Sequence, residues 1–387
     1  MVRVHVAVTG LGVVSALGTG VEQFWRGLMR GNSETGPIQT FDTAGYRCKL
    51  GGEVVGFTAA EPVGCARSVQ FAAEAVRQAV TDACLLDAGY AADRIGTCFG
   101  MVVGNRPGLE GGDLPSGAWL DPATVARLPA TEHGFGGPNR VLGTACAAGN
   151  SAVALAADLI AAGRAQAMVA GGADQLSQAM FMMFQSFGAM SPDQLMPFDR
   201  DRKGLLLGEG SAALVLEERS AAEARGARVY AEVLGHASYS DAFHMTAPHP
   251  QGLGARRSMR GALHRAGLNP TDVDYISAHG TGTPANDLIE ARAIRAVFGD
   301  YADTTPVSSI KGMLGHAQGA ASAIESVACL LAIANSTIPA NVGCNNIDPD
   351  CDIDVVIDGP RRRPVRVALN NAFGFGGNNC CVAFGAP

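Results

Sequence analysis

Strand-like and helix-like stretches alternate along all 387 residues, and this alternation constrains the fold more than any other feature. Short apolar runs such as 95–103 and 273–278 favour strands, whereas longer runs with one apolar face, such as 70–86 and 285–297, favour helices. Alternating strands and helices are typical of layered α/β proteins. We therefore expect an α/β fold whose central strands are largely parallel.

Two parts of the chain share one pattern, in which a short strand leads through a glycine-containing turn into a long Ala-rich helix. The pattern occurs at 141–162 and again at 306–335, without a strict residue-level repeat. A polar, glycine-punctuated stretch at 199–210 lies between them, and we expect the boundary soon after it. The sequence thus predicts an N-terminal half over residues 1–225 and a C-terminal half over residues 226–387.

Composition narrows the class of protein. Hydrophobic residues make up 47% of the chain and charged residues 17%, so the chain can bury a large core. The net charge is −7 and the densest basic run is only Arg361–Arg363, which gives nucleic-acid binding no electrostatic support. No run reaches the roughly 18 uninterrupted apolar residues of a membrane span, and the apolar start of the chain alternates like a strand.

Cysteine usage points to a reducing compartment. The ten cysteines include no CxxC pair and form no Cys/His cluster with the spacing of metal ligands. Such usage is typical of a protein whose cysteines are mostly small buried hydrophobes. We expect a cytoplasmic protein without a metal site.

One cysteine stands where a short strand gives way to a long helix, in the segment Gly143–Gly149. Cys146 would face unpaired backbone N–H groups and the positive end of the helix dipole there. Both favour a thiolate, which is the nucleophilic form of cysteine. An inert buried cysteine is the competing interpretation at this stage.

Two histidines stand at comparable positions in the second half. His279 opens a Gly-rich segment at the end of a strand, a usual place for site residues in α/β proteins, although a capping histidine would look the same. His316 begins the helix at 317–335, whose dipole should keep its imidazole neutral. Lys311 lies five residues earlier, and Glu325 lies in the helix's apolar face, where a carboxylate needs a partner unless it is solvated.

A fourth segment, Asn371–Asn379, has three glycines within four residues. The exposed backbone N–H groups of such a loop suit an oxyanion hole, and a plain tight turn is the alternative. No helix follows it, so a dinucleotide-binding loop is excluded. Gly10–Gly12 fails the same test, because no acidic residue lies at the expected distance.

Together these segments resemble the elongating β-ketoacyl-acyl-carrier-protein synthases, the ketosynthases of the thiolase superfamily. The resemblance covers nearly the whole chain, with further matching segments at Val8–Gly12, Ala170–Asp174, Pro197–Asp199, Gly208–Gly210 and Ser240–Thr246. Its specificity comes from the order of the four segments and from the spacing between His279 and Glu325. The resemblance implies a thiolase-like, pseudo-duplicated, five-layered αβαβα fold that is usually dimeric.

The resemblance also implies a role for each catalytic position. Cys146 would accept the acyl group, and His279 and His316 would hold a malonyl thioester and stabilise its enolate. Lys311 would order the histidines electrostatically, and Glu325 would support that network.

Further positions are implied around these catalytic residues. Phe375 would gate the site, and its N–H would complete an oxyanion hole with that of Cys146. Thr281, Thr283 and Thr246 would contact the pantetheine arm of the substrate.

The implied activity is an acyl transfer to Cys146 followed by decarboxylative condensation with malonyl-carrier protein, in fatty-acid or polyketide and polyene biosynthesis. It needs no metal or redox cofactor. The expected partners are an acyl carrier protein and either a second copy of the chain or a homologous ketosynthase-like chain.

The sequence departs from the family at three places. The region 104–141 is shorter than in typical members, 59–67 is lean, and Asn378 replaces a threonine or similar residue. In the family the first region helps to shape the dimer contact and the acyl pocket. Acyl-chain length and saturation, the type of dimer, and primary or specialised metabolism therefore stay open.

Two alternatives need an answer. Degradative thiolases pair the nucleophile with one histidine and a second cysteine, and Cys380 and Cys381 lie near the end of the chain. The presence of both His279 and His316 argues against that class. Inactive chain-length partners of ketosynthase heterodimers typically lack the nucleophile, whereas Cys146 is present.

Overall fold

Ten strands form a continuous path of hydrogen-bonded neighbours, in the order β12-β11-β15-β16-β10-β1-β9-β7-β5-β6, in a computed structural model that describes residues 4–58, 65–104 and 121–387. The first half contributes β1 (Val6–Ser15), β5 (Ile95–Gly100), β6 (Asn139–Leu142), β7 (Ala167–Asp174) and β9 (Gly210–Glu218). The second half contributes β10 (Ala231–Ser240), β11 (Tyr275–Ser277), β12 (Val307–Ser308), β15 (Val367–Gly374) and β16 (Asn378–Gly385). The short strands are β2 (Gly18–Thr19), β3 (Gly36–Pro37), β4 (Leu50–Gly52), β8 (Leu207–Gly208), β13 (Thr337–Ile338) and β14 (Arg361–Arg362).

The strand order repeats between the halves. Within each set of five, the first strand lies beside the fifth, which is followed by the fourth, the second and the third: β1-β9-β7-β5-β6 and β10-β16-β15-β11-β12. The two sets join where β1 pairs with β10, at Ala7↔Glu232 and Val8↔Ala231. The pseudo-duplication that the resemblance implied is therefore present in the topology.

The expectation of largely parallel central strands is wrong for the middle of the path. The ladders that join β15, β16, β10, β1, β9 and β7 are all antiparallel, whereas β5 and β11 pair in parallel with their neighbours on both sides. Parallel pairing follows where a helix crosses over between strands. Each half ends with a fifth strand that pairs antiparallel with its neighbours, and the first of these, β9, was not predicted from the sequence.

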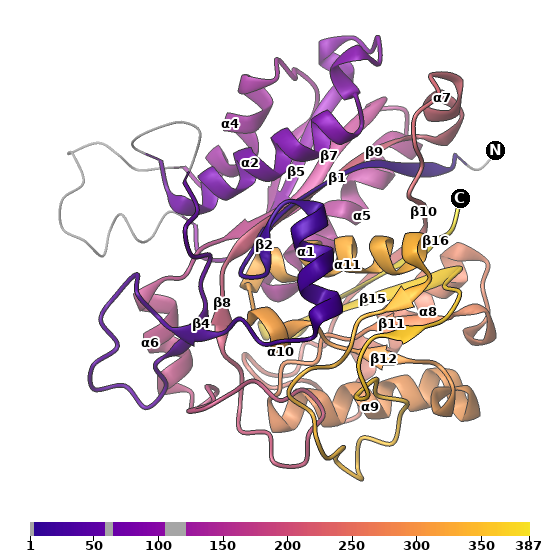
Figure 1. The fold of residues 1–387 in the computed structure, drawn as a ribbon. Helices are drawn as coiled ribbons and strands as arrows, with labels where there is room; N and C mark the ends of the chain where they lie inside the picture. Colours follow the sequence, from indigo (N-terminus) through magenta and orange to yellow (C-terminus); the bar gives the residue numbers. More distant parts are fainter. Residues whose placement is uncertain (1–3, 59–64, 105–120) are drawn as a thin grey trace.

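Helices and strands make five layers (Figure 1). Helices α2 (Arg67–Asp82) and α4 (Thr124–Glu132) cover the outer face of the first half, and α8 (Leu253–Ala266) and α9 (Pro284–Phe298) cover that of the second. Helices α5 (Ala148–Ala161) and α11 (Ala321–Asn335) lie between the two groups of strands. The remaining helices are α1 (Val21–Arg30), α6 (Gln178–Ser186), α7 (Arg219–Ala224) and α10 (Lys311–Leu314). This arrangement is the αβαβα fold.

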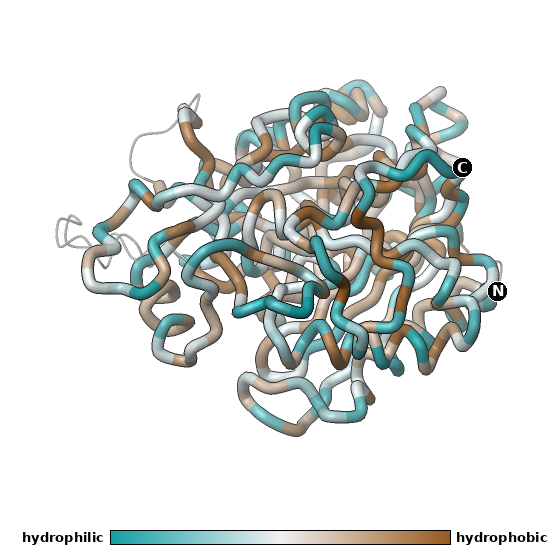
Figure 2. Tube along the Cα trace, turned by 60° about the horizontal axis from the view of Figure 1, so that its bottom comes forward, coloured by the Kyte–Doolittle hydropathy of each residue, from teal (hydrophilic) through white to brown (hydrophobic). Residues whose placement is uncertain are grey.

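The two central helices pack closely because their contact faces are made of small residues. A Cβ at Gly149 of α5 would lie 2.6 Å from the backbone nitrogen of Ala323 in α11, so only glycine fits there. Every residue of α11 before its last two is buried. The outer helices instead alternate between hydrophobic and hydrophilic residues, as expected for helices with one buried face (Figure 2).

One helical stretch within the described residues is long and apolar enough to cross a membrane by length and composition. It is Gln318–Asn335, which consists of α11 and the 3-10 turn that precedes it, and 89% of it is buried inside the fold. Its apolar character therefore matches its place in the central layer.

Candidate active site

The nucleophile candidate stands at the mouth of a central helix. Cys146 belongs to a 3-10 turn, Ala145–Ala147, that runs directly into α5. Ala145 has a φ of +51°, a left-handed conformation that a non-glycine residue adopts at a cost. The strained turn places Cys146, 8% exposed, at the N-terminal end of the helix.

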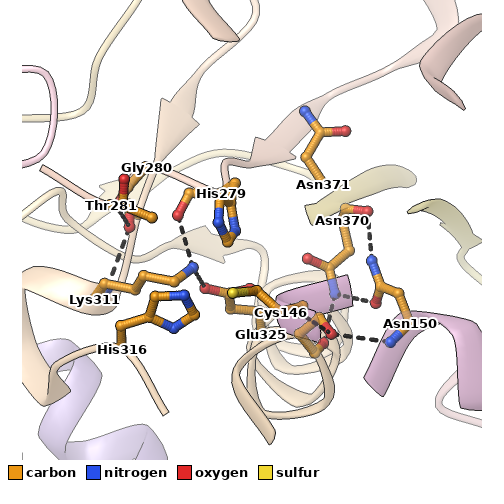
Figure 3. Close-up of polar contacts among 12 residues, drawn as sticks. Cys146, Asn150, His279, Gly280, Thr281, Lys311, His316, Glu325, Asn370 and Asn371 are labelled. Carbon is orange, nitrogen blue, oxygen red and sulfur yellow. Dashed lines mark hydrogen bonds and ion pairs between the residues drawn. The ribbon is translucent and has the colours of Figure 1, made fainter. Parts of the chain in front are cut away.

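The structure brings Cys146 together with two histidines from the other half (Figure 3). The sulfur and one nitrogen of each ring all lie within 4.8 Å of one another. The rings of His279 and His316 stand edge to face, with centroids 5.3 Å apart. All three side chains line one cavity of about 310 Å³.

His316 has a defined tautomer. Its Nδ1 accepts the backbone N–H of Gln318 at 3.2 Å, so the proton of the neutral ring sits on Nε2. His316 therefore offers a hydrogen-bond donor. The Nδ1 of His279 has no hydrogen-bond partner among the described residues, so this ring can present a donor or an acceptor to a substrate.

A buried ion pair lies behind the histidines. Lys311 Nζ donates to Glu325 and, at 2.7 Å, to the backbone carbonyl of His279 (Figure 3). Lys311 is 0% exposed and Glu325 1% exposed, and neither lines the cavity. Each of these buried charges thus has an ionic partner, as the position of Glu325 required.

Both histidines are held in the neutral form. Burial, which removes the imidazolium from water, lowers the pKa of each ring well below 6.5, and the positive charge of Lys311 lowers it further. By distance alone Cys146, His279 and His316 could also hold a metal ion, but the Lys311 charge beside them opposes a bound cation.

The expectation of a resting thiolate is wrong. Burial raises the pKa of Cys146 to about 11, because a thiolate at this site loses its hydration. Lys311 and the backbone N–H groups of Phe375 and Cys146 lower this pKa only in part. The free site therefore holds a thiol at neutral pH, which must give up its proton as it attacks.

The Gly-rich loop supplies one of those N–H groups. A Cβ at Gly374 would lie 2.9 Å from the nitrogen of Cys146, so glycine lets the loop reach the nucleophile. The ring of Phe375 stacks on Phe184 with centroids 5.3 Å apart, and its carbonyl accepts a hydrogen bond from Asn378 at 3.1 Å. Asn378 thus fixes the loop that carries Phe375.

Three threonines expected to contact the pantetheine arm line the same cavity. Thr281 and Thr283 share a hydrogen bond between their hydroxyl oxygens at 2.9 Å. Thr246 lines the cavity from the loop after β10. Cys146 and the three threonines therefore line one continuous cavity.

Sequence reasoning missed two carboxylates that hold the His279 loop. Glu290 accepts the backbone N–H groups of His279 and Gly280, each at 2.8 Å, and Asp287 accepts those of Thr281 and Gly282. Both are buried on α9, three residues apart. Two acids at that spacing on one buried helix face were the signal available in the sequence.

An amide network that also escaped the sequence analysis ties the two halves together beside the nucleophile. Asn150 on α5 and Asn370 on β15 are hydrogen-bonded through their side chains at 2.9 Å, and Asn370 also donates to Ser326 of α11 (Figure 3).

Of the departures noted in the sequence, residues 59–64 and 105–120 lie outside the described residues.

A buried cysteine at a helix mouth, facing two neutral histidines on this fold, defines a condensing enzyme of the thiolase type. Two family models match the chain: the beta-ketoacyl synthase N-terminal domain over residues 4–222 and the beta-ketoacyl synthase C-terminal domain over residues 230–345. The chain belongs to the β-ketoacyl synthase family.

Individual relatives agree with this assignment. The 3-oxoacyl-[acyl-carrier-protein] synthase 2 of Synechocystis sp. is 41% identical over 405 aligned positions, which cover 98% of this chain and 97% of the relative. The ishigamide ketosynthase/chain length factor structure has a TM-score of 0.94 at 38% identity, with both chains fully covered. A type II polyketide ketosynthase solved with its acyl-carrier protein, AntDE:AntF, has a TM-score of 0.92 at 32% identity, again with full coverage.

Proposed function

We propose that this ketosynthase takes an acyl group onto Cys146 and condenses it with a malonyl group carried on an acyl carrier protein. The observation that carries the proposal is the single cavity shared by Cys146, His279 and His316, with two backbone N–H groups at the sulfur. The enzyme is accordingly an acyltransferase that forms a carbon–carbon bond.

Acyl transfer is the first step. The thiol of Cys146 attacks the carbonyl carbon of an acyl-carrier thioester, its proton passes by way of a neutral imidazole to the departing carrier thiolate, and the acyl-Cys146 thioester forms. The N–H groups of Cys146 and Phe375 stabilise the tetrahedral oxyanion. We assign this proton transfer to His279, because no hydrogen bond to Nδ1 from the described residues fixes its tautomer and the ring is therefore free to accept a proton.

Decarboxylation follows at the two histidines. The bond between the malonyl carboxylate and its neighbouring carbon breaks, carbon dioxide leaves, and the electron pair becomes an enolate. His316 Nε2–H and an N–H of His279 donate hydrogen bonds to the enolate oxygen in a buried cavity. A neutral imidazole suits this step because a ring already protonated would transfer its proton and quench the carbanion.

Condensation completes the cycle. The enolate carbon attacks the acyl-Cys146 carbonyl, and the tetrahedral oxyanion again accepts the two N–H bonds. Its collapse expels the Cys146 sulfur as a thiolate, which takes up one proton from solvent and restores the thiol. The product is a β-ketoacyl group that remains on the carrier. Lys311, supported by Glu325, holds both histidines neutral, Phe375 gates the cavity, and Thr281, Thr283 and Thr246 bind the pantetheine arm.

The assembly is proposed from the relatives and the fold. The AntDE:AntF ketosynthase was solved with its acyl-carrier protein, and the ishigamide enzyme is described as a ketosynthase/chain length factor. We propose a carrier-protein partner, a homodimer or a heterodimer with a homologous chain, and a cytoplasmic location. We also propose that the chain consists of the halves 1–225 and 226–387.

The lining of the cavity favours this function over the two alternatives. A degradative thiolase needs a second cysteine at the site, but Cys380 and Cys381 lie inside β16 and outside the described lining. An inactive chain-length partner needs no nucleophile, whereas Cys146 stands at the cavity.

Product mass tests the proposal. Purified protein would be mixed with a hexanoyl-loaded carrier protein and a malonyl-loaded one. We expect one carrier to gain a 3-oxooctanoyl group while one carbon dioxide is released per product. Transfer of acetyl units to free CoA from acetoacetyl-CoA, without reaction of the malonyl carrier, would favour a degradative thiolase.

Removing the Lys311 charge is expected to move the acid limit of decarboxylation to higher pH. The double change Lys311→Met and Glu325→Gln removes both charges, so no unpaired buried ion is left. Because Lys311 lowers the pKa of both histidines, its loss raises these values toward 6.5 and the rings become protonated at a higher pH. Decarboxylation rates measured between about pH 5 and 8 would show the shift, and an unchanged acid limb would contradict this role of Lys311.

A further inference from the structure

A buried carboxylate of the first half holds the turn that follows His316. Asp174 ends β7 and is 0% exposed. Its oxygens accept the backbone N–H groups of Val102 at 2.9 Å, Val103 at 2.8 Å and Gly319 at 2.7 Å. Gly319 belongs to the second half and lies three residues after His316, so Asp174 ties β5 and β7 to the histidine's own turn.

The repeated topology shows what this carboxylate corresponds to. β7 and β15 are the fourth strands of their halves and have eight residues each, ending at Asp174 and Gly374. Asp174 therefore occupies the counterpart of Gly374, which meets the nitrogen of Cys146 on the catalytic side.

The turns before the central helices correspond in the same way. Each is a three-residue 3-10 turn that runs into its helix, and each begins at a non-glycine residue with positive φ, +51° at Ala145 and +53° at Gln318. The residue after each of these is Cys146 in one half and Gly319 in the other.

The turn that begins at Gln318 in the second half thus corresponds to the turn that carries Cys146 in the first half. The space beside it is filled by the side chain of Asp174. On the catalytic side, the backbone N–H groups of Phe375 and Cys146 favour the thiolate of Cys146 and lower its pKa in part. On the other side, the N–H of Gly319 points at the carboxylate of Asp174. A Cβ at Gly319 would lie 2.7 Å from that carboxylate oxygen and 2.8 Å from the Cα of Met101, so no nucleophile fits there.

We propose that Asp174 is a positioning residue that fills this counterpart of the oxyanion hole and thereby aims the imidazole of His316 at Cys146. The turn needs an external tie, because Gln318 is in a strained conformation and its side-chain amide has no hydrogen-bond partner among the described residues. The Gln318 N–H holds the His316 ring, and the next N–H, of Gly319, is held by Asp174. The inference rests on the proposed function, in which His316 acts in decarboxylation.

Asp174→Asn tests this inference, because the amide group has the shape of the carboxylate but turns one acceptor into a donor. At least one of the three backbone N–H groups that the Asp174 carboxylate accepts would then face an N–H of the new amide group. A displacement of about 1 Å at a reacting group costs about 10²-fold in rate, so we expect decarboxylation of malonyl-carrier protein to fall by roughly that factor. Acylation of Cys146 by hexanoyl-carrier protein should change less than about threefold, since Cys146 and Phe375 are held by other contacts.

Both rates would be expressed per chain that becomes acylated at Cys146, which restricts the comparison to folded protein. Asp274→Asn is the matched control. Asp274 is 9% exposed and also accepts two backbone N–H groups, those of Arg366 and Val367. It directly precedes β11, whereas Asp174 ends β7. Gly319→Ala perturbs the same hydrogen bond at its donor, the Gly319 N–H, and should likewise slow decarboxylation much more than acylation.

The inference is overturned if Asp174→Asn decarboxylates at the wild-type rate per acylated chain. It is also overturned if both rates fall together, or if Asp274→Asn shows the same split, since either result marks a general structural effect. A wild-type protein that fails to decarboxylate the malonyl carrier would instead refute the proposed function, so the two failures are distinct.

Discussion

Cys146→Ala is expected to abolish condensation, with a loss of roughly 10⁴-fold or more, because no other thiol lines the described part of the cavity and can hold the acyl chain as a thioester. The change removes one sulfur atom from a site where the residue is already buried, so folding should be little affected. Formation of the 3-oxoacyl carrier, followed by mass, measures the loss directly.

Cys380→Ala is the matched control for this prediction. Cys380 is 1% exposed and lies in β16 outside the described lining of the cavity. Its replacement should leave condensation within about threefold of wild type, as expected for a buried cysteine that serves only packing. Equal losses in the two variants would mean that the thiol of Cys146 is not the nucleophile.

His316→Ala should slow decarboxylation by a factor of roughly 10² to 10⁴, the usual range for one group that stabilises charge or handles a proton. The structural reason is the Nε2–H of His316, a donor whose tautomer is fixed by the backbone of Gln318. His279→Ala should give a loss in the same range. Measurement in a Cys146→Gln background isolates this step, because acyl transfer is then absent while both histidines remain.

His236→Ala controls for the loss of a buried imidazole. His236 is 9% exposed on β10, where its Nε2 lies 3.1 Å from Asp158, and it does not line the described cavity. Its replacement should leave carbon dioxide release unchanged. If His316→Ala and His279→Ala also released carbon dioxide at the undiminished rate, the enolate would have to be stabilised by other groups.

Local sequence signals were sufficient for the framework of the site. The junction of strand and helix placed Cys146 at a helix start, and the glycine spacing placed Phe375 in a loop, which are both properties of a few neighbouring residues. The prediction that His316 begins the long helix is wrong, because α11 begins at Ala321 and a 3-10 turn, Gln318–Ala320, precedes it. Burial and the charge of Lys311 lower the pKa of the His316 ring. The meeting of these residues in one cavity depends on the repeated topology. In the sequence, this topology is visible as the repeated pattern of a short strand, a glycine-containing turn and a long helix at 141–162 and 306–335.

Properties that depend on burial could not be predicted in this way. The helix dipole argued for a thiolate at Cys146, but removal from water has the larger effect and raises the pKa of the thiol. Asp174 and Glu290 each bind backbone N–H groups of segments that are distant in sequence or contributed by a loop. The spacing of Asp287 and Glu290 marks a pair of acids on one helix face, but the backbone N–H groups that a carboxylate accepts are brought to it only by the fold and cannot be identified from the sequence.

The antiparallel fifth strand β9 was missed for a related reason. Its residues read as an apolar run next to the polar stretch at the middle of the chain. Only pairing with β1 and β7 shows that it closes the first half as β16 closes the second. Strand direction follows from such pairing and not from composition.

The most direct test of the account is to map where the acyl group resides. The Cys84→Ser variant, which lacks the exposed cysteine, would be incubated with hexanoyl-carrier protein and digested. The masses of its peptides would then be measured by mass spectrometry. We expect one hexanoyl group, on the peptide that contains Cys146 and on no other cysteine. An acyl group on a different cysteine, or none with Cys146 intact, would contradict the claim that this sulfur and the two imidazoles form one catalytic site.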